Sequence, residues 1–191
     1  MIHNILIVGV GGQGTLLASR VLGSYAVLKD YDCKLSEVHG MSQRGGSVVT
    51  HVRMGDEKIS SPIVREGGAD IIIAFEKLEA MRWRHYLKDG GLIVVNDQEI
   101  MPMPVITGAR KYPHGVIDDM KKEGKRVLVV DAFDLAKEVG NTKAVNTVMI
   151  GALARNLHLE YDIFMKALEE TVPARFLEIN KLAFKKGYDV E

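Results

Sequence analysis

Glycines close to the N-terminus form the first pattern that points to chemistry. Gly9, Gly11 and Gly14 follow the spacing G-x-G-x-x-G, and Gly12 and Gln13 lie between the last two. In such a turn the first glycine permits a sharp bend, the second lets the backbone approach a ligand, and the third lets the next helix pack closely on the strand. The N-terminus of that helix presents free N–H groups and a partial positive charge, so the pattern predicts a site for phosphate or another anion. A tight strand-to-helix turn that binds nothing is the alternative.

A second polar, glycine-rich stretch covers residues 36–47, which read Ser-Glu-Val-His-Gly-Met-Ser-Gln-Arg-Gly-Gly-Ser. Its glycines indicate backbone that bends sharply or meets a ligand or another chain at close range. Arg44 offers a planar guanidinium that suits phosphate or carboxylate. Open α/β sheets bind ligands beyond the ends of their strands, so we expect a second part of the site here, with Ser42, Gln43 and Arg44. An exposed loop is the alternative, in which His39 would make only a structural hydrogen bond.

An acidic residue about 20 positions after the glycines would favour a nicotinamide cofactor, because it binds the ribose hydroxyls. Glu37 is the nearest candidate, but it lies slightly late in the sequence and runs directly into His39. No convincing substrate domain or catalytic acid–base pair follows the nucleotide-type pattern. A free-standing NAD(P)-binding oxidoreductase or a nucleotide-binding module therefore stays as the alternative function.

Cysteine and histidine usage limits the cofactors that this chain can hold. Cys33 is the single cysteine, which excludes an iron–sulfur cluster ligated by cysteines of this chain alone. The six histidines show no pairing at metal-ligand spacing, and no Gly-Asp-Gly motif for thiamine diphosphate occurs. We therefore expect neither a metal site nor a catalytic residue in this chain.

Charge and hydropathy narrow the possible partners. The 25 basic and 25 acidic residues give a net charge of zero, which does not favour nucleic acid or a membrane surface. No apolar stretch approaches the ~20 residues that a membrane-spanning helix needs, and the N-terminus lacks a signal-peptide pattern. We expect a cytoplasmic protein.

Short apolar runs alternate with helical patterns, which predicts an α/β fold: a Rossmann-like, doubly wound sheet in a single domain, residues 1–191, with a helical C-terminal segment. The expected strands cover residues 2–8, 32–38, 47–54, 70–75, 92–95 and 126–130. The expected helices cover residues 13–29, 77–86, 116–123, 142–157, 162–171 and 175–186. Two prolines exclude regular helix and central strand from residues 101–104. Asn96 could line a cleft or cap a turn, and Asn146 could cap a helix or face an interface.

The two glycine-rich motifs together closely resemble the gamma-type domain of the 2-oxoacid:ferredoxin oxidoreductases, with the indolepyruvate type as the nearest match. Residues 146–152, which read Asn-Thr-Val-Met-Ile-Gly-Ala, look like the start of a helix in that family. The resemblance covers nearly the whole chain, and residues 36–46 are its most specific part.

The resemblance implies a complex that oxidatively decarboxylates a 2-oxoacid to acyl-coenzyme A and reduces ferredoxin. Thiamine diphosphate and iron–sulfur clusters would belong to a larger catalytic subunit, with coenzyme A as co-substrate. This chain would shape the active site and be inactive alone. Carried onto this sequence, the resemblance implies that the glycine turn from Gly9 through Gln13 to Gly14 faces phosphate. It also implies that Ser42, Gln43 and Arg44 face the coenzyme or the partner subunit.

A heterodimer or a dimer of heterodimers follows from the same resemblance. The C-terminal third also carries more apolar surface than one face of a modest sheet needs, which favours an interface with another subunit. The apolar residues in question are Met149, Ile150, Leu153, Leu157, Phe164, Leu168, Phe176, Leu177, Leu182 and Phe184.

Overall fold

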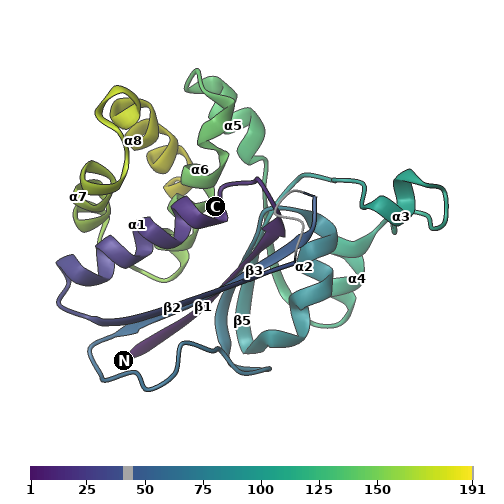
Figure 1. Cartoon of the computed structure of the whole chain (residues 1–191), viewed down its shortest axis with the longest axis horizontal. Helices are drawn as coiled ribbons and strands as arrows, with labels where there is room; N and C mark the ends of the chain where they lie inside the picture. The colour runs from purple at the N-terminus through teal and green to yellow at the C-terminus, as the bar shows by residue number, and fades with distance from the viewer. Residues whose placement is uncertain (41–44, 191) are drawn as a thin grey trace.

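A mixed six-stranded sheet forms the centre of the computed structural model, which describes residues 1–40 and 45–190 (Figure 1). Within those residues the strand order is β2-β3-β1-β4-β5-β6. The strands are β1 (Ile2–Val10), β2 (Asp32–His39), β3 (Ser47–Gly55), β4 (Ala69–Ala74), β5 (Leu87–Asn96) and β6 (Arg126–Val130). β1, β4, β5 and β6 run parallel, whereas β3 is antiparallel to both of its neighbours. The hairpin of β2 and β3 therefore extends the parallel part of the sheet on one side.

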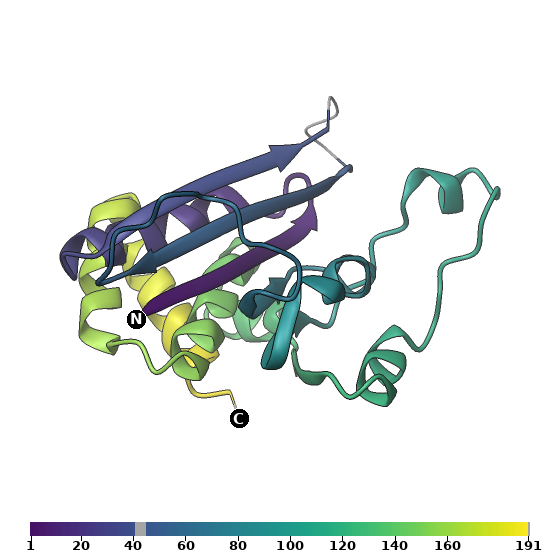
Figure 2. The same ribbon diagram turned by 90° about the horizontal axis from the view of Figure 1, so that it is seen from below.

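Helices cover both faces of this sheet (Figures 1 and 2). The helices are α1 (Thr15–Leu28), α2 (Lys77–Trp83), α3 (Met103–Ile106), α4 (Val116–Lys122), α5 (Ala132–Glu138), α6 (Val145–Asn156), α7 (Tyr161–Thr171) and α8 (Ala174–Tyr188), with short 3₁₀ turns at Arg84–Tyr86 and Thr142–Ala144. β1 shows how the strands supply both cores, because successive side chains of a strand point to opposite faces. Ile5 and Ile7 pack with α1 and α5–α8, while Leu6 and Val8 pack with α2 and α4.

The predicted fold class is confirmed, and most predicted elements agree with the structure to within a few residues. The direction of β3 was not predicted, because an apolar strand pattern carries no information on its orientation. One expectation is wrong: Met103 and Pro104 begin a short helix, α3. Proline is tolerated there because the first N–H groups of a helix have no intrahelical acceptor.

The apolar C-terminal helices serve mainly the core of this chain. Tyr25 of α1 stacks on Phe164 of α7 at 4.4 Å between ring centroids, and Phe164 stacks on Phe184 of α8 at 5.1 Å. Of the residues expected to supply an interface, only Phe176 and Leu182 are exposed. The expected surplus of apolar surface in this segment is therefore largely absorbed by packing within the chain.

Two glycines bring α6 and α8 into close contact. A Cβ atom added to Gly187 would lie 1.8 Å from the carbonyl oxygen of Val148, and one added to Gly151 would lie 2.1 Å from that of Phe184. Both distances are far below any tolerable contact, and the obstructing atoms are backbone. The helix pair can pack in this way only with hydrogen at both positions.

We predict that Gly187→Ala lowers the free energy of unfolding by about 1–3 kcal/mol or more, because the two helices must separate. Gly23→Ala is the matched control, since Gly23 also lies in a helix and its added Cβ would meet only Leu35 at an ordinary 3.5 Å. It should raise stability by up to about 1 kcal/mol through helix propensity. Urea unfolding of both variants tests the packing, and equal effects of the two substitutions would contradict it.

Candidate functional site

The glycine turn follows β1 and leads into α1, as the sequence predicts. Gly12 and Gly14 have φ angles of +102° and +86°, a left-handed conformation that residues with a Cβ rarely adopt. At Gly14 a Cβ would also lie 2.7 Å from Nδ2 of Asn146, in the first turn of α6. The backbone conformation therefore favours glycine at both positions, and at Gly14 a larger residue would also displace the Asn146 side chain.

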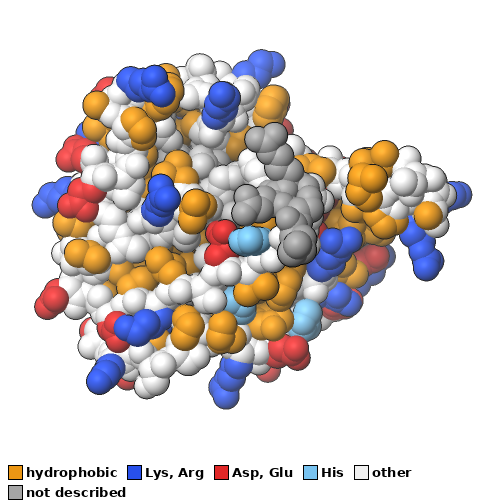
Figure 3. Space-filling view, in the orientation of Figure 1, with side chains coloured by type: hydrophobic (Ala, Val, Ile, Leu, Met, Phe, Trp, Pro, Cys, Tyr) orange, Lys and Arg blue, Asp and Glu red, His pale blue; other side chains and the backbone are white. Residues whose placement is uncertain are grey.

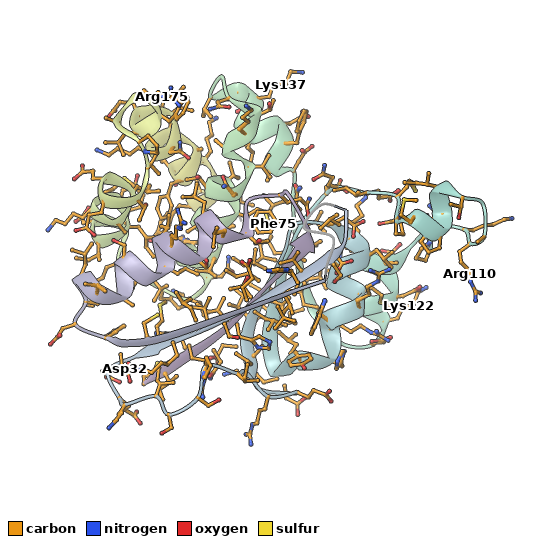
Figure 4. The ribbon with its side chains drawn as sticks, in the orientation of Figure 1. Asp32, Phe75, Arg110, Lys122, Lys137 and Arg175 are labelled. Atoms are coloured by element: carbon orange, nitrogen blue, oxygen red, sulfur yellow. The ribbon has the colours of Figure 1, made fainter. Side chains whose placement is uncertain are left out.

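Hydrogen bonds from the Gln13 side chain link this turn to neighbouring segments of the sheet. Its Oε1 accepts a hydrogen bond from the N–H of Val10 at 2.7 Å. Its Nε2 donates to the carbonyl oxygen of Phe75 at 3.0 Å and to Oε1 of Gln98 at 3.1 Å. Phe75 follows β4, and Figure 4 labels it beside the upper end of the sheet. The predicted contact of Gln13 with phosphate stays a prediction, and in this structure its side-chain amide is used for internal contacts.

Backbone hydrogen bonds join the two glycine-rich motifs. The N–H of Gly11 donates to the carbonyl oxygen of Gly46 at 2.8 Å, and the N–H of Gly45 donates to that of Gly11 at 3.3 Å. These bonds continue the antiparallel pairing in which Val10 lies opposite Ser47. The glycine turn and the described end of the second motif therefore form one continuous edge.

A depression of about 380 Å³ opens at this edge. The turn and the start of α1 form one wall, and the end of β2 with part of β3 forms the other. Its lining residues are Gly11, Gly12, Gly14, Thr15, Leu16, Glu37, His39 and Val48. The first turn of α1 holds no acidic residue, and no described side chain caps it. Its free N–H groups and partial positive charge suit an anion.

The structure places only some of the predicted site residues at this depression. Gly11, Gly12 and Gly14 line the depression, whereas Gly9 lies within β1, and an added Cβ there would meet Gln13 and Phe75. Ser42, Gln43 and Arg44 lie outside the described residues, so their predicted roles stay predictions. The ring nitrogen Nδ1 of His39 lies 3.0 Å from the carbonyl oxygen of Gly40, which is compatible with the structural role considered for it.

Asn96 joins neighbouring elements at the same edge of the sheet. Its Nδ2 donates to the carbonyl oxygen of Phe75, and its Oδ1 accepts from the N–H of Ala132, both at 3.2 Å. Asn96 is fully enclosed, at 1% exposure. Of the two alternatives, the structure favours the local hydrogen-bonding role over the lining of a cleft.

The sequence interpretation missed a pair of buried carboxylates next to the site. Glu76 begins α2, where its side chain accepts from the N–H of Glu79 at 2.9 Å. Glu79 accepts a hydrogen bond from the Ser47 hydroxyl at 2.5 Å and one from Arg82 at 2.7 Å. Their position directly after a predicted buried strand was the available signal. Ser47 is both the last residue of the second motif and the first residue of β3. Its hydrogen bond to Glu79 therefore fixes this end of the motif against α2.

Burial raises the pKa of the Glu79 carboxyl above its usual value, although the hydrogen bond from Ser47 and the charge of Arg82 act in the opposite direction. The folded state then binds the Glu79 proton more tightly than the unfolded chain does. This contribution to stability is complete below the unfolded pKa, near 4.5, and is lost as pH rises through the higher folded value.

We predict that the stability of the wild-type protein falls relative to Glu79→Gln as pH rises above about 4.5, because the glutamine cannot ionise. The difference should level off once Glu79 is ionised in the folded state. Chemical unfolding of both proteins across this range measures the effect. A difference independent of pH would show that folding leaves the pKa of Glu79 unchanged, and one that grows in favour of the wild type would show that the folded state prefers the paired carboxylate.

A wider hollow of about 570 Å³ lies at the opposite end of the strands, with Arg53, Asp70 and Lys88 in its lining. Lys88 pairs with Asp70, and Arg53 is hydrogen-bonded to Asn4 and to the carbonyl oxygen of Ser61. These contacts already engage Asp70, Lys88 and Arg53 within the chain. The smaller depression at the glycine turn, with its free helix N-terminus, is therefore the better candidate site.

Within the described residues, no helix is long and apolar enough to cross a membrane. The same residues contain no cluster of three or more histidine, cysteine, aspartate or glutamate side chains arranged to hold a metal ion.

Comparison with known proteins agrees with the resemblance seen in the sequence. The chain is 41% identical over 192 residues to indolepyruvate oxidoreductase subunit IorB of Thermococcus kodakarensis, covering 97% of this chain and 94% of that protein. A keto/oxoacid ferredoxin oxidoreductase gamma subunit from Geobacter sulfurreducens has the same fold, with a TM-score of 0.73, 23% identity, and coverage of 98% of this chain and 96% of that one.

A longer protein contains the same fold as one part. The 2-oxoglutarate:ferredoxin oxidoreductase of Magnetococcus marinus, solved with 2-oxoglutarate, coenzyme A and succinyl-CoA bound, matches 99% of this chain over 31% of its own chain, with a TM-score of 0.68 and 18% identity. The family model for pyruvate ferredoxin/flavodoxin oxidoreductases matches residues 4–190. Because this match omits only the first three residues and the last one, the chain belongs to the pyruvate ferredoxin/flavodoxin oxidoreductase family.

Proposed function

We propose that this chain is the small, gamma-type subunit of a 2-oxoacid:ferredoxin oxidoreductase that acts on indolepyruvate or a related aryl pyruvate. The observation that carries the proposal is the family match over residues 4–190, together with 41% identity to an indolepyruvate oxidoreductase subunit over nearly its whole length. The reaction would oxidatively decarboxylate the 2-oxoacid to an acyl-coenzyme A and pass the electrons to ferredoxin.

The larger catalytic subunit would hold the redox cofactors. Iron–sulfur clusters bound by thiolates need several cysteines, and this chain has one. Thiamine diphosphate would supply the carbanion chemistry, and the clusters would remove the electrons one at a time. We assign no catalytic side chain to this subunit, so it should be inactive alone and active in a heterodimer or a dimer of heterodimers.

Coenzyme A is our proposed ligand for the edge formed by the glycine turn. The N-terminus of α1 supplies N–H donors for a phosphate, and the first turn of that helix holds no acidic residue. Glu37, on the other wall of the depression, accepts a hydrogen bond from the Thr50 hydroxyl at 3.2 Å and can accept another from a ligand hydroxyl. A phosphate would therefore bind on the α1 side and a ribose on the β2 side.

A nicotinamide dinucleotide is the second candidate ligand, because Glu37 and the glycines share one depression. The strand order argues against it. In dinucleotide-binding sheets the strand that carries the acidic residue lies directly beside the first strand. Here β3 separates β2 from β1, so Glu37 is one strand farther away than that geometry requires. A fluorescence titration with NADH, in which we expect no saturable binding, separates the two candidates.

Reconstitution tests the proposed function. The purified chain should show no oxidoreductase activity, and adding the larger subunit of the complex should restore 2-oxoacid-dependent reduction of an artificial electron acceptor. The experiment must be anaerobic so that the clusters of the larger subunit stay intact. A well-folded chain that neither binds that subunit nor changes its activity would contradict the proposal.

We predict that Leu16→Glu weakens coenzyme A binding several-fold in the reconstituted complex, because it places a negative charge at the proposed phosphate position. Leu16 is half exposed at the second position of α1, and an acidic side chain there should keep or raise helix stability by about 0.3–1 kcal/mol. Leu16→Gln is the uncharged control. The apparent KM for coenzyme A measures the effect, and equal values for the two variants would place the phosphate elsewhere.

A further inference from the structure

A projecting arm, residues 99–114, is a feature of this chain that the proposed function does not yet use. It leaves the sheet after β5 and returns to α4, and α3 forms its outer part. Figures 1 and 2 show the arm extending beyond the body of the molecule in two perpendicular views. We refer to residues 101–111 as its tip and to the residues on either side as its base.

The base is fixed by one buried carboxylate. Glu76 is 1% exposed, and its Oε1 accepts a hydrogen bond from the N–H of Ile100 at 3.2 Å and another from the hydroxyl of Tyr112. Tyr112 is itself buried. The outgoing and returning segments of the arm therefore meet at the same side chain, next to the candidate site. This arrangement holds the arm in place from the body of the protein.

The tip has its own hydrogen-bonded structure. The carbonyl oxygen of Pro102 accepts from the N–H groups of Val105 and Ile106 at 2.8 and 3.1 Å, and that of Pro104 accepts from the N–H of Arg110 at 2.9 Å. These local bonds form the turn of α3 without help from the body. The turn of α3 therefore forms while Met103 and Ile106 stay exposed.

Apolar side chains on the tip point into solvent. Met101, Met103 and Ile106 are 41%, 64% and 65% exposed. Figure 3 shows hydrophobic side chains gathered on the upper side of the arm. Apolar groups clustered on a pre-formed, projecting element are characteristic of an interaction surface, and methionine adapts well to the shape of a partner.

Two cations accompany this apolar surface. Within the described residues, neither Arg110 nor Lys111 forms an ion pair, whereas Glu99 at the base contacts Lys77 at 3.4 Å. Figure 4 shows Arg110 at the outer end of the arm, directed away from the body. A partner that covers the apolar groups would bring these cations to the rim of the contact, where carboxylates complement them.

We propose that the tip docks into an apolar groove, rimmed by carboxylates, on the larger catalytic subunit. The inference rests on the proposed function, which supplies that subunit. We take the larger subunit as the partner because Glu76 fixes the base of the arm beside the edge proposed for coenzyme A, where the active site of that subunit would meet this chain.

The fixed base gives this docking a consequence for the active site. Glu76 is adjacent to Phe75, whose carbonyl oxygen accepts the hydrogen bond from Gln13 of the glycine turn. A partner bound to the tip would therefore have a fixed position relative to the edge proposed to bind coenzyme A. The arm would act as the element that aligns the two subunits.

The test measures the dissociation constant of the reconstituted complex by titrating labelled chain into the purified large subunit under anaerobic conditions. The double variant Met103→Asp/Ile106→Asp should bind at least about tenfold more weakly, because exposed apolar anchors dominate such contacts. Val27→Asp is the matched control, since Val27 is 74% exposed on α1, outside the arm. All variants should melt within a few degrees of the wild type, because the tip does not use these side chains to fold.

A second variant, Arg110→Glu/Lys111→Glu, tests the charged rim separately. It should slow association at low ionic strength, and the difference from the wild type should shrink as salt is added. The inference is overturned if both arm variants bind like the wild type, or if Val27→Asp weakens binding as much as they do. Self-association of the isolated chain that the apolar variant abolishes would assign the tip to a second copy and overturn it as well. A wild-type chain that does not bind the large subunit would instead overturn the proposed function, and this inference with it.

Discussion

Backbone pairing between the two glycine-rich motifs is the constraint on which the rest of this structure depends. Gly11 exchanges hydrogen bonds with Gly45 and Gly46, so the turn after β1 and the end of the second motif form one edge. This contact is possible only because the hairpin folds β3 back between β2 and β1. The strand order thus places the described ends of the second motif beside the N-terminus of α1. In a dinucleotide-binding sheet, β2 would lie directly beside β1 instead.

The polar groups that surround this edge serve mostly to hold it in shape. Gln13 and Asn96 bind backbone atoms of neighbouring strands, and Glu79 ties Ser47 to α2. Such a network supplies hydrogen-bond donors that are held in place and a surface of fixed shape. We propose that these contacts shape the surface that this subunit presents to the larger one.

Sequence patterns predicted the fold class, most of the elements and the glycine turn, because apolar periodicity and glycine spacing are local signals. They did not predict the direction of β3 or the buried pair Glu76 and Glu79, since both depend on contacts between distant segments. Glu76, for example, accepts hydrogen bonds from Ile100 and Tyr112 of the arm, which lie 24 and 36 positions away in the sequence. The apolar C-terminal helices were interpreted partly as an interface, but the close approach of α6 and α8 at two glycines lets the chain bury most of them itself.

We propose that the edge formed by the glycine turn faces coenzyme A within an assembled oxidoreductase. Hydrogen–deuterium exchange of the reconstituted complex, with and without coenzyme A, tests it most directly. Exchange at the amides of residues 11–16 and 45–48 should become slower when coenzyme A is added to the complex. Unchanged exchange at these amides, with slowing confined to the opposite end of the strands or to the larger subunit, would contradict the claim.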